Sequence, residues 1–521
     1  MTAQLSVLLT TEDTYPYQEG SVSMWCEALI RNMPDASFVI AGISARPARP
    51  LISKLPPNVS RVIPVPLWGT MGVSEIRSDL DWRGVRQLRA GARQPATITR
   101  FADLFKILVA DLIDEHANVK RLTLTLRDLA RIFVTSDYDI LMHHPITWRA
   151  MKAVIEEWAK GWAEPAQGSP VRPSLYDVTE ALHVLTRWLA PIGVPMPRCQ
   201  IVHATTAGLS SLPAIVSRAE YGTPFLLTEH EIYLRERLIA WTASDASPFM
   251  KWFAVRVTRR IVELSLAMAD VIVPVSGWGG RWQQQLGAAP SHIEPIRTGV
   301  DPLRCAPQAM PAWAQPTMIW LGRINPLKDV ITLIEAMDLV RREMPAARTL
   351  LFSKASVGDA AYEAQCRSRI ADLGLEQSIL FKDFAPSLNE VFAQGHLSVI
   401  SSISEALPFP AIEAMFCGRP VVGTAVGGVP EVLVEGGMLV QPRNPADLAR
   451  ACLTLLRDPP QCEALGSRAR IHAEANFSLG RAIHAYANLY RRMQGLLVCS
   501  KRVVPAWARH GAEVFVDGFA D

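Results

Sequence analysis

The sequence lacks the features that mark nucleic-acid-binding, membrane-spanning and secreted proteins. Its 521 residues carry a formal net charge of only +3, whereas nucleic-acid binding favours a strong basic excess. No stretch of about 18 uninterrupted apolar residues is present to cross a bilayer, and the first residues show no basic segment followed by an apolar run. We therefore expect a cytoplasmic protein without a membrane span or a nucleic-acid partner, and leave open its attachment to a membrane complex.

The sequence is also poor in signatures of disulfide or zinc frameworks. It has eight cysteines but no Cys-x-x-Cys. Several of them, such as Cys417 and Cys452, lie inside apolar helical patterns. We expect buried free thiols in a reducing compartment rather than disulfides or a metal site.

Two Asp-x-Asp sequences offer the main alternative for metal binding. They are Asp79-Leu80-Asp81 and Asp137-Tyr138-Asp139, and they match a short motif used in metal–nucleotide sites. The motif is frequent by chance, and the second copy is predicted simply to lead into a strand over 140–142. We therefore expect neither a metal nor a cofactor.

The length favours two domains, because a single core does not usually grow to 521 residues. Apolar β-rich runs alternate with helical patterns in both halves, which predicts an α/β fold of two doubly wound, Rossmann-like sheets. We predict a first domain over 1–305 with a helical insertion at about 68–195, a proline-rich linker at 306–316, a second domain over 317–485, and a terminal helix and tail over 486–521. The expected strands lie at 4–9, 37–43, 200–204, 225–228 and 271–275, and then at 317–321, 349–352, 379–381, 397–400, 420–422 and 438–440.

The stretch from Ser404 to Met415 places two carboxylates, Glu405 and Glu413, eight positions apart. Two prolines between them force extended or turning backbone before a helix can start. Glu405 is therefore expected to leave a loop, and Glu413 to project from the first turns of the helix that follows. Such a pair can hold two parts of one ligand at a helix N-terminus, whose free N–H groups and partial positive charge favour phosphate.

A second stretch, Ile319 to Asp329, supplies the opposite charge. It predicts a strand, a turn at Gly322 and the start of a helix, with Arg323 and Lys328 following the strand. Ligands of open α/β sheets usually bind where parallel strands end. Two fixed cations at that edge can bind a diphosphate and stabilise it as it departs.

Together the two stretches resemble the signature of the retaining glycosyltransferases of family 4, a Gly-Arg…Lys segment followed by a Glu-x7-Glu segment that ends in Glu-Ala-Met. This resemblance covers about 270–490. Two patchier stretches, Thr11–Tyr17 and Thr228–Arg237, are similar to the PelF-like branch, named for a glycosyltransferase of Pel exopolysaccharide synthesis. The resemblance implies the GT-B fold, in which two Rossmann-like domains face a central cleft.

The resemblance also implies a reaction and its partners. A sugar would pass from a nucleoside-diphosphate sugar, with UDP as the carrier, to a saccharide or polysaccharide acceptor with retention of configuration. The product would be an exopolysaccharide, and a peripheral place at an inner-membrane polysaccharide synthase complex is left open. Whether retention uses front-face attack or a covalent intermediate is also left open.

Residue roles follow from the same resemblance. Glu413 would hold the ribose hydroxyls and Glu405 would face the sugar near the reacting carbon. Arg323 and Lys328 would neutralise the leaving diphosphate, so that no metal is needed, and His230 would donate a hydrogen bond to a sugar hydroxyl. The remaining donor-site residues are Ala406, Leu407, Gly20 and Ser21, and the residues expected at the acceptor or cleft are His203, Tyr233 and Arg235.

Several positions depart from the resemblance or have an ordinary structural interpretation. Relatives usually have two glycines where this chain has Gly20-Ser21, PelF-like sequences tend to have Gly at the position of Glu231, and relatives often have Gly-Pro near Lys354. A single histidine after an apolar strand is more often structural, and the Gly427-Gly428 turn can be a plain tight turn.

Two other functions compete with transfer. One is a catalytically silent nucleotide-sugar-binding scaffold or regulator of a polysaccharide synthase. The other is a nicotinamide-dependent oxidoreductase, which needs Gly-x-Gly-x-x-Gly at a first strand–helix turn. Neither candidate turn supplies that pattern.

Overall fold

The computed structural model describes residues 4–46, 50–69, 72, 75, 77, 79–160, 172–353, 359–383 and 387–500, with side chains to 495. Lys354 and the tail from 501 lie outside the described residues. The chain divides into two compact units. The first comprises Met1–Val273, Trp282–Glu294 and Ala487–Asp521, and the second comprises Pro274–Arg281 and Pro295–Tyr486.

The first unit contains a six-stranded sheet with the order β3-β2-β1-β4-β5-β6. Its strands are β1 Leu5–Glu12, β2 Ala36–Ser44, β3 Val59–Pro66, β4 Ile201–Ala204, β5 Phe225–Glu229 and β6 Val271–Pro274. Pairing is parallel from β3 through β5. The carboxyl ends of β1, β4 and β5 therefore lie at one edge, where a doubly wound sheet binds its ligands.

The second unit repeats this topology with the order β12-β11-β10-β7-β8-β9. Its strands are β7 Thr317–Leu321, β8 Arg348–Phe352, β9 Ile379–Lys382, β10 Leu397–Ile400, β11 Val421–Thr424 and β12 Gly437–Val440. All pairs are parallel. Because β7 and β10 are neighbours, the loops that follow them share the carboxyl edge of this sheet. The six strands predicted for this half are confirmed.

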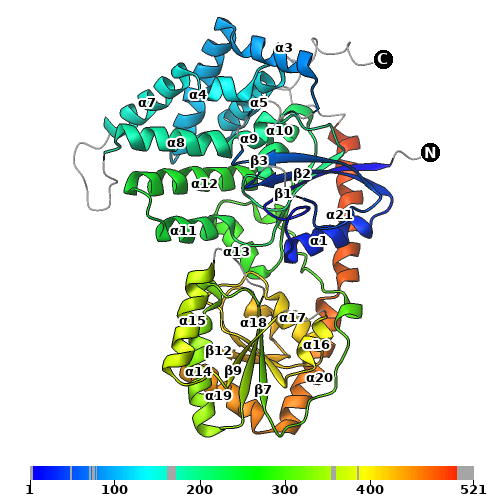
Figure 1. Cartoon of the computed structure of the whole chain (residues 1–521). Helices are drawn as coiled ribbons and strands as arrows, with labels where there is room; N and C mark the ends of the chain where they lie inside the picture. Colours follow the sequence, from blue (N-terminus) through cyan, green and yellow to red (C-terminus); the bar gives the residue numbers. More distant parts are fainter. Residues whose placement is uncertain are drawn as a thin grey trace. The chain divides into compact units, whose positions relative to one another are not determined.

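Helices connect the strands in both units (Figure 1). Those that follow strands of the first sheet are α1 Ser21–Arg31, α10 Ser211–Tyr221, α11 Tyr233–Ala243, α12 Pro248–Met268 and α13 Gly277–Gln285. Those after β7 are α14 Val330–Glu343, α15 Ala360–Asp372, α16 Leu388–Phe392, α17 Phe409–Phe416, α18 Val429–Val432, α19 Pro445–Leu456, α20 Pro459–Asn476 and α21 Leu479–Ser500. Short 3-10 turns lie at Pro290–His292, Pro302–Arg304 and Pro326–Lys328.

A helical region separates β3 from β4. It contains α3 Trp82–Ala92, α4 Pro95–Ile113, α5 Val119–Thr135, α6 Tyr138–Met142, α7 Pro145–Lys160, α8 Leu175–Trp188 and α9 Ala190–Gly193. Its buried side chains join the core of the first sheet through apolar residues such as Phe101, Phe105 and Leu126. The region is therefore packed as part of the first unit.

The strand predicted over 140–142 is wrong, because this segment is helix α6. Asp137 is its N-cap, and its Oδ1 accepts hydrogen bonds from the backbone N–H groups of Asp139 and Ile140. Asp81 caps α3 in the same way by accepting from Gly84 N. Both Asp-x-Asp sequences thus start helices.

The proline-rich segment 306–316 belongs to the second unit. The fully buried Arg419 donates to the carbonyl groups of Gln308 and Ala309 at 2.9 and 2.8 Å. Ala306 N also donates to Asn389 Oδ1 at 2.8 Å. These bonds tie the segment to the elements after it.

Two predictions about the whole chain can be compared with the described residues. None of the described helices combines the length and apolar character that a membrane crossing requires. The cysteines among the described side chains are free thiols, all buried apart from the partly exposed Cys199.

Candidate active site

The candidate site of the second unit begins with an ion pair between two predicted residues. Lys328 Nζ lies 2.5 Å from Glu405 Oε1, although the two residues are 77 positions apart. Ser402 Oγ donates to the same carboxylate oxygen at 2.7 Å. The Lys328 side chain is 24% exposed and that of Glu405 only 9%. The pair is therefore shielded enough for its geometry to be fixed, while the ammonium group can still meet a ligand.

The backbone holds the two loops of this pair together. Ser401 Oγ donates to the Lys328 carbonyl at 2.8 Å, and Ile403 N donates to the Leu327 carbonyl at 2.9 Å. Asn325 Oδ1 accepts from Lys328 N at 3.1 Å and closes the turn. The loops after β7 and β10 are thus joined by main-chain contacts as well as by charge.

The glycine turn before α18 supports Glu405 from the other side. Gly428 N donates to the Glu405 carbonyl at 3.0 Å. Gly427 has φ +55°, and a Cβ there would lie 1.6 Å from the Glu405 oxygen. A Cβ on Gly428 would lie 2.2 Å from the Ala406 carbonyl oxygen. Both glycines are therefore required by the close approach of the Glu405–Ala406 backbone.

Glu413 lies on α17 and is almost fully buried. Burial raises the pKa of its carboxyl to about 7, and the charge of Arg304 opposes that rise. Among the described residues, no hydrogen bond or ion pair joins Glu413 to Glu405, Lys328 or Arg323. A carboxylate whose burial outweighs the stabilising charge of Arg304 is suited to accept hydrogen bonds from a ligand.

The other predicted donor-site residues of this unit differ in exposure. Arg323 follows β7, is exposed, and forms no ion pair with any residue the structure describes. Leu407 is buried in the apolar cluster that also holds Ala411 and Ile412. Arg323 is thus available to an anion, whereas Leu407 anchors the loop.

In the first unit, His230 follows β5 and is 7% exposed. Its ring packs edge-on against Trp25 of α1 with centroids 4.6 Å apart. Burial lowers the pKa of its imidazole to about 3. Its Nε2 has no hydrogen-bond partner in the described part of the chain. A neutral buried imidazole with one unused nitrogen can donate to, or accept from, a ligand hydroxyl.

His203, on β4, is fully buried. Its Nδ1 is hydrogen-bonded to Tyr490 Oη at 2.7 Å and its Nε2 to Thr228 Oγ1 at 2.8 Å. Burial, together with the nearby His230, lowers the pKa of the imidazole to about 3. Both ring nitrogens are therefore used within the chain, by partners on β5 and α21.

Tyr233 and Arg237 of α11 meet a carboxylate that the sequence reasoning did not single out, Glu12. Glu12 Oε1 accepts from Tyr233 Oη at 2.8 Å and from Arg237 at 3.1 Å, and Oε2 accepts from Leu209 N at 2.9 Å. Burial raises the pKa of Glu12, and Arg237 and Tyr233 oppose the rise. The position of Glu12 at the end of β1 is the signal that could have revealed it. Arg235 instead lies beside Glu236, at 3.6 Å.

A second buried carboxylate, Glu229, was also missed although it stands next to His230. Its Oε1 accepts from Tyr233 N at 3.1 Å, and its Oε2 lies 3.4 Å from Gln283 Nε2. Burial raises its pKa to about 7. Glu12 and Glu229 thus hold the start of α11 against the carboxyl edge of the first sheet.

Gly20 and Ser21 lie at the start of α1. Gly20 is the N-cap residue with extended backbone, φ 164°, and no side chain caps the helix. A Cβ at Gly20 would meet nothing within 4 Å. Neither the backbone conformation of Gly20 nor its described neighbours therefore require glycine at this position.

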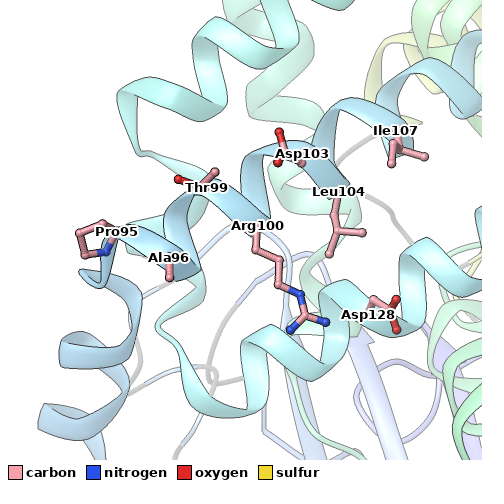
Figure 2. Close-up of a pocket in the computed structure, with 8 residues that line it drawn as sticks. All are labelled: Pro95, Ala96, Thr99, Arg100, Asp103, Leu104, Ile107 and Asp128. Carbon is pink, nitrogen blue, oxygen red and sulfur yellow. The ribbon is translucent and has the colours of Figure 1, made fainter. Parts of the chain in front are cut away.

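A surface hollow of about 610 Å³ lies between α4 and α5. Figure 2 shows Arg100 reaching from α4 toward α5, with Leu104 and Asp128 nearby. None of the predicted site residues lines it. The hollow is separate from the residues described above.

Comparisons with known proteins agree with this architecture. Residues 5–291 match the family described as a domain of unknown function (DUF3492), and residues 315–458 match glycosyl transferases group 1. The chain belongs to the DUF3492 family, with a group 1 glycosyltransferase region in its second half. It is a glycosyltransferase.

Particular relatives support the same class, and solved structures support the fold. The chain is 31% identical to D-inositol 3-phosphate glycosyltransferase of Streptomyces bingchenggensis over 61% of this chain and 67% of that protein. Sucrose-phosphate synthase of Thermosynechococcus elongatus matches with a TM-score of 0.59 and 16% identity, over 95% of this chain and 100% of that one. HepE of Anabaena, solved with UDP, matches with a TM-score of 0.58 and 14% identity, over 94% and 100%. The predicted GT-B fold is confirmed.

Proposed function

We propose that this enzyme is a PelF-like glycosyltransferase that transfers a glycosyl unit from a UDP-sugar to a saccharide acceptor, with retention of configuration, in exopolysaccharide synthesis. The choice of UDP is supported by HepE, a protein of the same fold that was solved with UDP and with UDP-glucose. Retention and the exopolysaccharide product are carried by the resemblance of the two sequence signatures.

The observation that carries the proposal is the Lys328–Glu405 pair at the carboxyl edge of the second sheet. In the proposed complex Lys328 and Arg323 contact the diphosphate and stabilise the negative charge that develops as UDP leaves. Glu405 faces the donor sugar. No metal is needed for this step, since two cations already oppose the diphosphate.

Glu413 is proposed to bind the ribose. Two ribose hydroxyls can donate to its carboxylate, replacing the water that burial has removed. Their hydrogen bonds would stabilise the ionised form and lower the pKa of Glu413 from its value near 7 in the free protein. Donor binding should therefore release protons near neutral pH.

His230 is proposed to bind a hydroxyl of the donor sugar through its unpartnered Nε2. Tyr233 and Arg235 remain candidates for the acceptor side. A buried hydrogen-bonding atom without a partner costs stability until a ligand satisfies it, and a sugar hydroxyl would satisfy Nε2 here.

Thermal unfolding with UDP-, GDP- and ADP-sugars tests the donor. A ligand present at a hundred times its Kd stabilises the native state by about 2.7 kcal/mol, so the UDP-sugars should raise the Tm and the others should not. Release of UDP, abolished in Glu405→Ala, then separates a transferase from a protein that only binds. A Tm raised only by GDP- or ADP-sugars would contradict the choice of donor.

A further inference from the structure

The surface of α3 carries a row of arginines outside the site described above. The helix contains Arg83, Arg86 and Arg89, ends at Arg93, and has no acidic residue between Trp82 and Ala92. The whole chain has a net charge of only +3. Helix α3 therefore carries a local excess of positive charge.

Helical geometry aligns these side chains. Trp82, Arg86, Arg89 and Arg93 are spaced by four, three and four residues, so they fall within about 60° of one another around the helix axis. All four are exposed, Trp82 by 67%. We call Trp82, Arg86, Arg89 and Arg93 the arginine stripe.

An adjoining side of α3 holds the helix in place. Leu88 and Ala92 are buried there, and the helix contacts α4, α5 and α6. Figure 1 shows α3 at the top of the helical region. The arginine stripe is thus displayed by a folded element, and its charge does not depend on a loose segment.

Two nearby carboxylates, Asp81 and Asp137, neutralise part of this charge. Arg89 lies 3.6 Å from Asp137, and Asp81 is held by Gly84 N at the start of the helix. Arg86 and Arg93 form no ion pair with any residue that the structure describes. Arg83 lies over the Trp82 ring, 5.4 Å from its centroid.

We propose that the arginine stripe binds the surface of a membrane that contains anionic phospholipids. Guanidinium groups suit phosphate oxygens, and an exposed indole beside arginines is typical of elements that lie at the bilayer–water interface. Charge complementarity selects this partner: several exposed cations and one amphipathic ring match a layer of phosphates over acyl chains. The enzyme would then work next to a membrane without crossing it.

Co-sedimentation of the full-length protein with vesicles tests the proposal. Binding is expected with vesicles of phosphatidylcholine plus phosphatidylglycerol, not with phosphatidylcholine alone, and should weaken as salt is added. The double variant Arg86→Glu/Arg93→Glu should weaken binding by roughly tenfold or more. Each basic residue near an anionic surface contributes about 1 kcal/mol to the binding free energy. Trp82→Ala should weaken binding by roughly threefold.

The matched control is Arg468→Glu with Arg481→Glu, which changes the net charge equally at two exposed positions of α20 and α21. It should bind vesicles as the wild type does. Unchanged binding by Arg86→Glu/Arg93→Glu, or equal loss in the control, would overturn the assignment. Retention on heparin without binding to vesicles would also overturn it, by identifying a site for a soluble polyanion. Thermal unfolding should be unchanged in both double variants, since all four arginines are exposed.

Discussion

Lys328 and Glu405 form a 2.5 Å ion pair that joins the loops after β7 and β10. Because Ser402 also donates to Glu405, the carboxylate is fixed before any ligand arrives. We expect Lys328→Ala to lower the rate of UDP release by about 10² to 10³, the loss typical of removing one charge-stabilising donor. A steady-state assay with the UDP-sugar found by thermal shift measures it. Lys382→Ala, at an exposed position at the end of β9, is the control and should retain full activity.

Gly427 offers a test of how the Glu405 loop is held. Gly427→Ala should destabilise the protein and abolish UDP release, because its Cβ would lie 1.6 Å from the Glu405 carbonyl oxygen and the loop must move. Gly374→Ala is a matched control: Gly374 also has positive φ, 61°, but its Cβ would meet nothing within 4 Å. The control should lose only about 1–2 kcal/mol of stability and keep its activity. Equal effects of the two substitutions would show that backbone strain alone is responsible.

The buried Glu413 should make stability depend on pH in a defined direction. Its pKa is about 7 in the folded protein, against an ordinary value of 4.5, so the folded state binds the proton more tightly than the unfolded chain does. The resulting stability is complete below pH 4.5 and is lost as the pH rises through 7. Glu413→Gln should therefore be more stable than the wild type at pH 8, by roughly 3 kcal/mol, with little difference at pH 4.5.

Urea unfolding at these two pH values measures that difference. Exposed Glu435→Gln is the control, and it should follow the wild type. Glu229, whose pKa is also raised to about 7, contributes in the same pH window and is present in all three proteins. A difference at pH 8 that is equal to the difference at pH 4.5 would contradict the assigned cause.

His230 should show opposite effects on stability and activity. Phenylalanine keeps the edge-on contact with Trp25 and removes the unpartnered Nε2. We expect the free energy of unfolding of His230→Phe to stay within about 1 kcal/mol of the wild type or to rise, while UDP release falls at least tenfold. Denaturant unfolding and the activity assay should be run on the same preparation. A stable variant with full activity would remove His230 from the site.

Tyr490 should matter for stability through its bond to His203. Tyr490→Phe leaves the buried Nδ1 without its partner, which should cost about 1–3 kcal/mol. Tyr176→Phe, at a position that is 72% exposed, should cost nothing measurable. If both variants unfold at the same denaturant concentration, the His203–Tyr490 bond contributes no net stability.

The sequence predicted elements best where apolar runs are continuous. In the second sheet β7, β10 and β11 are such runs and are buried along their whole length. β3 was missed because Val59–Pro66 contains Arg61, Pro64 and Pro66. The sheet order explains how a strand tolerates two prolines, since β3 lies at the edge and pairs only with β2. Helix α6 was mistaken for a strand because a three-residue apolar run has no distinguishing period.

The site was harder to predict than the fold. Spacing along the chain places Glu405 in a loop and Glu413 on a helix, as observed, but it cannot show that Lys328 contacts Glu405 across 77 positions. The sequence also does not show which carboxylates are buried. Glu12 and Glu229 resemble ordinary polar residues at strand ends until their contacts with α11 are known. The functional roles of all these residues therefore remain predictions, which the variants above can test.

Helix α21 limits where the chain can be cut to make recombinant fragments. It begins with residues assigned to the second unit and ends with residues assigned to the first, and its Tyr490 supplies the partner of His203. A recombinant fragment that stops after the first sheet would lack Tyr490 and would expose the His203 imidazole, which is buried in the full-length protein. Co-expression of that fragment with a peptide spanning the end of α21 is the cleaner way to obtain it in folded form.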